Sequence, residues 1–309
     1  MGTKKTRVPP LDAGWLWLES KSNLMHGCML AVFTPPEGAG ADYVLTAVSE
    51  MRKHDVATSP FDRKLAEGPF SGLVPRWEKV PSVDTDYHLR YTRLEEPSER
   101  EFGRLVSEIQ GGELDPDYPL WTIDVIDNLP GGRFALVGKM HHALVDGVSA
   151  LGILAQWLSP ESGTRDVPPM WAYERAPRKP RATTSAPRSN ILRTILGLLR
   201  AFRLAVTGVS ARPYSAPRSP MNVPITSDRR VSTLSLDLNR FRKLADRGDA
   251  TINDVLLAVC SAGLRRYLTE TDSLPERPLI TNIPVSVRSE AGAGSGGNQI
   301  SWAMLSLGT

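Results

Sequence analysis

The sequence has little of what marks a secreted or membrane-spanning protein. It contains two cysteines, Cys28 and Cys260, among 309 residues, which argues against a disulfide scaffold and favours a reducing compartment. No apolar run reaches the roughly 18 residues that a membrane span needs. Residues 1–10 contain no apolar stretch that would serve as a signal peptide. These absences predict a protein on the cytoplasmic side of the membrane.

Other simple chain types are excluded by composition. Glycine and proline, 25 residues each, show no G-X-Y period, so the chain is not collagen-like. Hydrophobic residues make up 41% of the chain, which allows a sizeable core and excludes disorder of the whole chain. The sequence has no internal repeats, and its length corresponds to about two domains.

Positive charge is concentrated in one part of the sequence. The net charge is +3, but residues 174–230 alone carry twelve Arg and Lys against two acids. Such a segment can bind nucleic acid, anionic lipid or an acidic cofactor. It contains no RNA-binding aromatic signature, zinc-finger spacing or helix-turn-helix spacing, so no nucleic-acid partner is expected. A lipid or a phosphorylated cofactor is favoured instead.

The spacing of apolar residues predicts helices and strands that alternate, which is typical of a mixed α/β (α+β) class. Asp12 is a candidate N-cap of the first helix, and Ser98 with Glu101 forms a capping box. Helices are expected over residues 10–19, 41–53, a stretch after Ser98, and 147–158. Strands are expected over residues 29–33, 121–126 and 134–140.

The sequence predicts three parts: a first domain at residues 1–158, a basic linker at residues 159–230, and a partial second domain at residues 231–309. The linker is rich in Pro, Arg and Ser and holds one helical stretch, residues 191–206. The second domain is expected to hold strands 231–236, 279–287 and 300–307 and helices 238–247 and 252–267. So small a sheet would expose an edge and an uncovered face, so we expect this domain to be incomplete or completed by another chain.

The heptapeptide HHALVDG at residues 141–147 is the strongest candidate site. Strand alternation would send His141 and His142 to opposite faces, and no third ligand stands at zinc spacing, so no metal is expected. One imidazole at a strand end, with an ordinary pKa near ~6.5, suits removal of a proton from an alcohol, thiol or amine. Asp146 would orient the imidazole or anchor the loop, and Gly147 would permit a sharp turn. The competing interpretation is a buried core histidine.

This motif resembles the HHxxxDG motif of acyl-CoA-dependent acyltransferases, and its surroundings resemble the bacterial wax ester synthase/diacylglycerol acyltransferase branch. The further matching segments are PLDA at 10–13, PLW at 119–121, LPGG at 129–132, ND at 253–254, PVSVR at 284–288 and GN at 297–298. The resemblance implies two chloramphenicol-acetyltransferase-like domains with a tunnel between them, open to acyl-CoA on one side and to the acceptor on the other.

The resemblance also implies roles for single residues. His142 would be the general base that deprotonates a diacylglycerol or fatty alcohol, so that direct transfer from fatty acyl-CoA gives triacylglycerol or a wax ester. His141 would contribute shape and hydrogen bonding. Asp146 would be structural, in a salt bridge for which Arg288 is the candidate partner. The fatty acyl-CoA is a co-substrate, and no other cofactor is expected.

Three further positions have two interpretations each. Asp254 completes a capping box with Thr251, while Asn253 is a candidate polar group near a developing oxyanion. Trp121 is either a packing residue or part of an acyl channel. The basic amphipathic stretch at 191–206 suits a peripheral position at the inner membrane or a lipid droplet, unless it packs against the protein. Two other functions stay open: a truncated, inactive lipid-surface protein, and another HHxxxDG acyltransferase or condensation enzyme.

Overall fold

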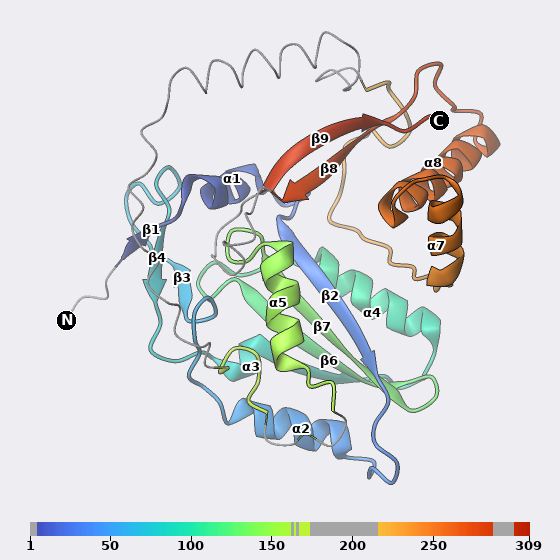
Figure 1. The fold of residues 1–309 in the computed structure, drawn as a ribbon. Coiled ribbons are helices and arrows are strands. Elements are labelled where there is room, and N and C mark those ends of the chain that lie inside the picture. The colour runs from blue at the N-terminus through green and yellow to red at the C-terminus, as the bar shows by residue number, and fades with distance from the viewer. Residues whose placement is uncertain (1–4, 162–163, 165–166, 174–215, 287–299) are drawn as a thin grey trace. The chain divides into compact units, whose positions relative to one another are not determined.

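The computed structural model describes residues 5–161, 164, 167–173, 216–286 and 300–309. They divide into two compact units (Figure 1): residues 5–173 with 225–232 form the first, and residues 216–224, 233–286 and 300–309 form the second. The predicted helical stretch at 191–206 and the candidate partner Arg288 lie outside the described residues.

A four-stranded sheet forms the centre of the first unit. Its strands, in spatial order, are β2 (His26–Phe33), β7 (Arg133–His141), β6 (Trp121–Leu129) and β5 (Leu89–Arg93). β7 pairs antiparallel with both β2 and β6, whereas β5 runs parallel to β6. β7 is therefore an inner strand with hydrogen-bonding partners along both edges, and the double histidine lies at its end.

Helices cover both faces of this sheet (Figure 1). The helices of the first unit are α1 (Pro10–Leu18), α2 (Tyr43–Arg52), α3 (Thr85–His88), α4 (Glu99–Gly111) and α5 (Gly147–Trp157). Ile123 and Val125 of β6 belong to a core cluster that includes residues of α2 and α5. Ile126 and Val137, on the other side of the pleat, pack with α4. This arrangement confirms the mixed α/β class.

A smaller antiparallel sheet adds to the first of these clusters. Its strands are β1 (Thr6–Arg7), β4 (Arg76–Lys79) and β3 (Arg63–Leu65), in that order. Trp77 of β4 is buried in the cluster that also contains Val8, the residue after β1. The segment around β1 is therefore packed against the hydrophobic core next to α1.

Helix starts follow local capping chemistry. Ser98 Oγ accepts the Glu101 N–H at 3.2 Å and caps α4 as predicted, but the Ser98 N–H donates to Glu96 O and the Glu101 carboxylate bonds to Arg104, so the capping box is only half formed. The prediction for Asp12 was wrong: α1 begins at Pro10, and Asp12 lies buried inside its first turn. Proline suits the first helical position because its fixed φ is already helical and the N–H it lacks would have no partner there.

The described residues of the second unit form two helices and two strands. They are α7 (Leu238–Arg247), α8 (Ile252–Glu270) and the antiparallel pair β8 (Ile280–Ser286) and β9 (Ile300–Ser306). Thr251 and Asp254 form the predicted capping box of α8. The strand predicted at 231–236 was wrong, because those residues pair with no strand. Instead Val231 joins the first unit and donates its N–H to Ser107 Oγ of α4 at 3.2 Å.

Candidate active site

The double histidine stands where β7 passes into the loop before α5. β7 ends at His141, and His142 donates its backbone N–H to Met25 O, next to β2, at 2.9 Å. The ring of His142 stacks on Trp15 of α1, with centroids 4.9 Å apart and planes at 29°. The side chain of His141 points instead toward Glu19, at the end of α1. The two imidazoles therefore have different surroundings, as strand alternation predicts.

The ring of His141 is fully buried, with a hydrogen bond at one nitrogen and a carboxylate close to the other. Its Nδ1 accepts the Ala143 N–H at 2.9 Å, so the proton of the neutral ring is on Nε2. Nε2 lies 3.3 Å from Glu19 Oε2, which is ion-pair distance without the alignment of a linear hydrogen bond. Burial raises the pKa of Glu19, but the contact with His141 and the Met25 N–H outweigh burial and leave that pKa below its ordinary value.

The ring of His142 is half-buried beside a small residue. Its Nε2 would lie 3.8 Å from a Cβ built on Gly27 of β2, so the missing side chain leaves room next to this nitrogen. Burial lowers the pKa of His142, the neighbouring His141 lowers it further, and Asp146 opposes them. His142 is therefore neutral near pH 7 and able to accept a proton.

Asp146 and Gly147 shape the loop that follows. Asp146 is buried, and its Oδ1 accepts the Ser149 N–H at 2.7 Å, so it is the N-cap of α5. This bond supports the loop-anchoring role, and the proposed partner Arg288 lies outside the described residues. The prediction that Gly147 permits a sharp turn was wrong: its φ is not in the left-handed region, and a Cβ there would meet no atom within 4 Å.

The other predicted site residues are placed as follows. Trp121 is fully buried, donates its indole N–H to Phe61 O at 3.1 Å and stacks on His88, so its contacts are those of a core residue. Its part in acyl binding stays a prediction. Asp254 caps α8 through Thr251. Asn253 is exposed in the first turn of α8, in the second unit, and its oxyanion role stays a prediction.

A buried polar cluster lies beneath the carboxyl end of α4. Lys139 Nζ donates to Ile109 O and Gly112 O, each at 2.8 Å, and His26 Nε2 bonds to Gln110 O at 2.9 Å. A cation near the last carbonyls of a helix is favourable for the helix dipole. Burial lowers the pKa of Lys139, and it lowers that of His26 to about 4.

Cys28 lies on β2 next to this cluster and pairs in register with Lys139. It is half-buried, and burial raises the pKa of its thiol to about 11 although Lys139 opposes the change. Cys260, on α8 of the second unit, is exposed. Neither thiol belongs to the histidine site.

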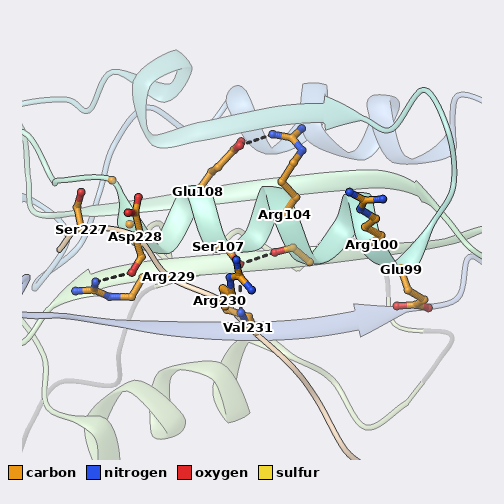
Figure 2. Close-up of a pocket in the computed structure, with 13 residues that line it drawn as sticks. Glu99, Arg100, Arg104, Ser107, Glu108, Ser227, Asp228, Arg229, Arg230 and Val231 are labelled. Carbon is orange, nitrogen blue, oxygen red and sulfur yellow. Dashed lines mark hydrogen bonds and ion pairs between the residues drawn. The ribbon is translucent and has the colours of Figure 1, made fainter. Parts of the chain in front are cut away.

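A groove of about 840 Å³ lies between α4 and residues 227–231. Figure 2 shows the residues that line it. Arg104 in this groove pairs with Glu101 and Glu108 of its own helix. A Cβ on Gly111 would lie only 2.6 Å from Ser227 O, so the two backbones are in close contact there. No residue of the HHALVDG motif lines the groove, which is a packing contact within the first unit.

Two kinds of feature are absent from the described part of the chain. No group of three His, Cys, Asp or Glu there could hold a metal ion. No helix in that part has the length and apolar character that a membrane crossing requires.

Sequence analysis missed Glu19, Trp15, Lys139 and His26. The sequence did contain a cue for Lys139, because a lysine in an apolar strand is rarely buried without partners. The sequence contained no cue for Glu19 and Trp15, because their contacts depend on how α1 packs beside β2.

Similarity to solved structures identifies the fold class of this chain. The first condensation domain of the calcium-dependent antibiotic synthetase aligns with 99% of this chain and 70% of its own, with a TM-score of 0.54 and 18% identity. That likeness shows the fold alone. The wax ester synthase/diacylglycerol acyltransferase of Marinobacter aquaeolei VT8 aligns with 91% of this chain and 65% of its own, with a TM-score of 0.71 and 33% identity. The fold is therefore the chloramphenicol-acetyltransferase-like fold that the resemblance implied.

Sequence comparison narrows the class to a family. The model of the wax ester synthase/diacylglycerol acyltransferase catalytic domain matches residues 8–256. A Mycobacterium tuberculosis protein named a probable diacylglycerol O-acyltransferase, Tgs2, is 34% identical over 97% of this chain and 68% of its own. A second protein of that organism is 36% identical over 96% of this chain and 63% of its own. The chain belongs to this family and spans about two thirds of the length of these relatives.

Proposed function

We propose that the chain catalyses acyl transfer from a fatty acyl-CoA to the hydroxyl of a diacylglycerol or a long-chain alcohol, with His142 as the general base. The observation that carries this proposal is the half-buried imidazole of His142, held beside Gly27 and kept neutral by burial. Family membership supports the substrate class, because the relatives carry the names of these activities.

The proposed step needs one base and no covalent enzyme intermediate. The neutral imidazole takes the proton of the acceptor hydroxyl while its oxygen attacks the thioester carbonyl carbon. The tetrahedral intermediate then expels the CoA sulfur, which receives that proton from the imidazolium. The products are the ester and free CoA, and His142 returns to its neutral form.

The experiment measures ester formation from labelled palmitoyl-CoA with dioleoylglycerol or with hexadecanol. We expect His142→Ala to lower turnover by about 10²-fold or more, the usual contribution of a general base. His54→Ala is the matched control, because His54 is exposed and its hydrogen bonds to Met51 O and the Trp171 indole are made by its backbone. Turnover by His142→Ala equal to that of His54→Ala would refute the proposed base, and no turnover by the unmodified chain would refute the proposed activity.

We further propose that the protein works at a lipid surface, either the inner membrane or a lipid droplet. The basic segment at residues 174–230 supports this, because arginines near an anionic surface each contribute about 1 kcal/mol. Both acceptors and both products are lipids, so a peripheral position would shorten their path to the site.

A further inference from the structure

The carboxylate of Glu19 contacts His141 of the motif and the backbone of Met25. α1 ends at Leu18, and Glu19 follows it with extended backbone dihedrals, φ −70° and ψ 139°. The chain then turns through residues 20–25 and enters β2 at His26. Glu19, directly after α1, therefore contacts both the residue before β2 and the last residue of β7.

Each carboxylate oxygen of Glu19 reaches a different part of the motif. Oε2 lies 3.3 Å from Nε2 of His141. Oε1 accepts the backbone N–H of Met25 at 3.2 Å. Met25 in turn accepts the backbone N–H of His142 through its carbonyl oxygen at 2.9 Å. One side chain is thus connected to His141 directly and to His142 through a single residue.

These connections fix two properties that a general base needs. The contact at His141 Nε2 agrees with the tautomer that the Ala143 N–H imposes at Nδ1, so the ring of His141 has one orientation. The connection through Met25 fixes the backbone from which the ring of His142 extends. His141 is fully buried, and the Glu19 carboxylate contacts His141 and the Met25 N–H, so both side chains are assigned to positioning and not to proton transfer.

We infer that Glu19 is a positioning residue, which holds the imidazole of His142 in its reactive orientation through His141 and Met25. The inference rests on the proposed function only in naming His142 as the base. A displacement of about 1 Å at a catalytic group can reduce a rate about 10²-fold, so loss of these connections is expected to lower kcat. Substrate binding depends on other residues, so KM is expected to change little.

The kinetic test compares Glu19→Ala with Glu19→Gln. Alanine removes both connections, whereas the glutamine carbonyl oxygen can still accept the Met25 N–H and the side chain keeps its length beside His141. We expect Glu19→Ala to lower kcat about 10- to 100-fold with KM for palmitoyl-CoA within about threefold, and Glu19→Gln to recover most of kcat. Glu50→Ala is the control, because Glu50 pairs with Lys53 on the surface of α2. Unchanged kcat in Glu19→Ala, or no recovery in Glu19→Gln, overturns the inference.

A second readout does not require turnover. The chain has five histidines, so ¹⁵N-labelled imidazoles can be followed individually by NMR. We expect the ring nitrogens of His141 to show the Nε2–H tautomer in both chains, because the Ala143 N–H still occupies Nδ1, and the Nε2 signal to shift in Glu19→Ala when the carboxylate beside it is removed. The buried His88, whose Nδ1 bonds to Trp121 O at 2.7 Å, is the internal reference and should not change.

The two readouts separate the inference from the proposed function. An inactive chain whose His141 signals still change in Glu19→Ala would support the positioning role and refute the acyl-transfer proposal. Unchanged His141 signals in Glu19→Ala would overturn the positioning role whatever the turnover.

Discussion

At the scale of single residues, two adjacent histidines are made different by their surroundings. His141 is fully buried with a ring nitrogen occupied by the Ala143 N–H, whereas His142 is half-buried and stacks on Trp15. Only His142 therefore combines partial access with a neutral imidazole. The difference follows from strand alternation at the end of β7, which separates neighbouring side chains onto opposite faces.

The lowered pKa of His142 predicts a specific pH dependence. A general base works when unprotonated, so kcat/KM is lost as the pH falls through the pKa of His142, which lies below the ordinary 6.5. At pH 6.5 an unshifted imidazole would be half protonated, so we expect kcat/KM there to exceed half of its plateau. The measurement is kcat/KM for palmitoyl-CoA from pH 5 to 8.

Asp146 provides a control for this pH profile. Its charge raises the pKa of His142, so Asp146→Asn should move the acidic limb to still lower pH. An acidic limb centred at or above pH 6.5 in the unmodified chain would contradict the assignment of the base to His142.

Sequence reasoning identified His141, His142 and Asp146 because they form one contiguous motif. It placed Asp254 correctly because a capping box is local. Glu19 and Trp15 could not be found in this way, because their contacts depend on the packing of α1 against two strands. The role given to Gly147 failed because a glycine in a sequence does not reveal its φ, which here any residue could adopt.

At the scale of elements, α4 is held at its end and along its outer side. Lys139 and His26 bond to the carbonyls at its carboxyl end, and residues 227–231 lie against its outer surface (Figure 2). The strand predicted at 231–236 is replaced by this contact. The apolar residues of this segment predicted a strand that pairs with another strand. Val231 instead packs against α4, and Leu234 is 82% exposed.

The close contact at Gly111 predicts opposite effects of the same substitution at two sites of α4. Alanine at Gly111 would place its Cβ 2.6 Å from Ser227 O, a backbone atom that must move, so we expect destabilisation of about 1–3 kcal/mol. Alanine at Gly103 would meet Val231 O at an ordinary 3.9 Å, so its helix propensity should stabilise by up to about 1 kcal/mol. Thermal unfolding of both variants checks this, and equal shifts of Tm would contradict the contact.

Most elements were predictable because their signals are local. Apolar alternation identified β6 and β7, and capping residues identified α4 and α8. The order of the strands was not predicted, because pairing between β2 and β7 joins segments about a hundred residues apart. No local pattern contains that information.

At the scale of the whole molecule, positive charge is unevenly distributed along the chain. Residues 174–230 carry a net charge of +10 and the remainder −7. Such an asymmetry favours adsorption to an anionic surface through one part of the chain. Electrostatic attraction of this basic segment to a lipid surface would suit an enzyme whose acceptor substrates are proposed to lie in a lipid phase.

Deletion of residues 190–206 is expected to move the protein from anionic lipid vesicles to the soluble fraction in a flotation assay. The charge itself is tested by replacing Arg193, Arg200 and Arg203 with glutamine, which should weaken flotation most at low salt, because added salt screens the same attraction in the unmodified chain. The matched control replaces Arg240, Lys243 and Arg265, which are exposed on α7 and α8, with glutamine. Unchanged flotation of the deletion variant would refute the membrane role of this stretch.

The different surroundings of the two thiols make the natural sequence suitable for site-selective labelling. The thiol of Cys28 stays protonated near neutral pH because its pKa is about 11, and it is half-buried on β2. Cys260 is exposed on α8. A maleimide fluorophore added near pH 7 would therefore attach at Cys260, so the second unit can carry a single optical reporter without any engineered cysteine.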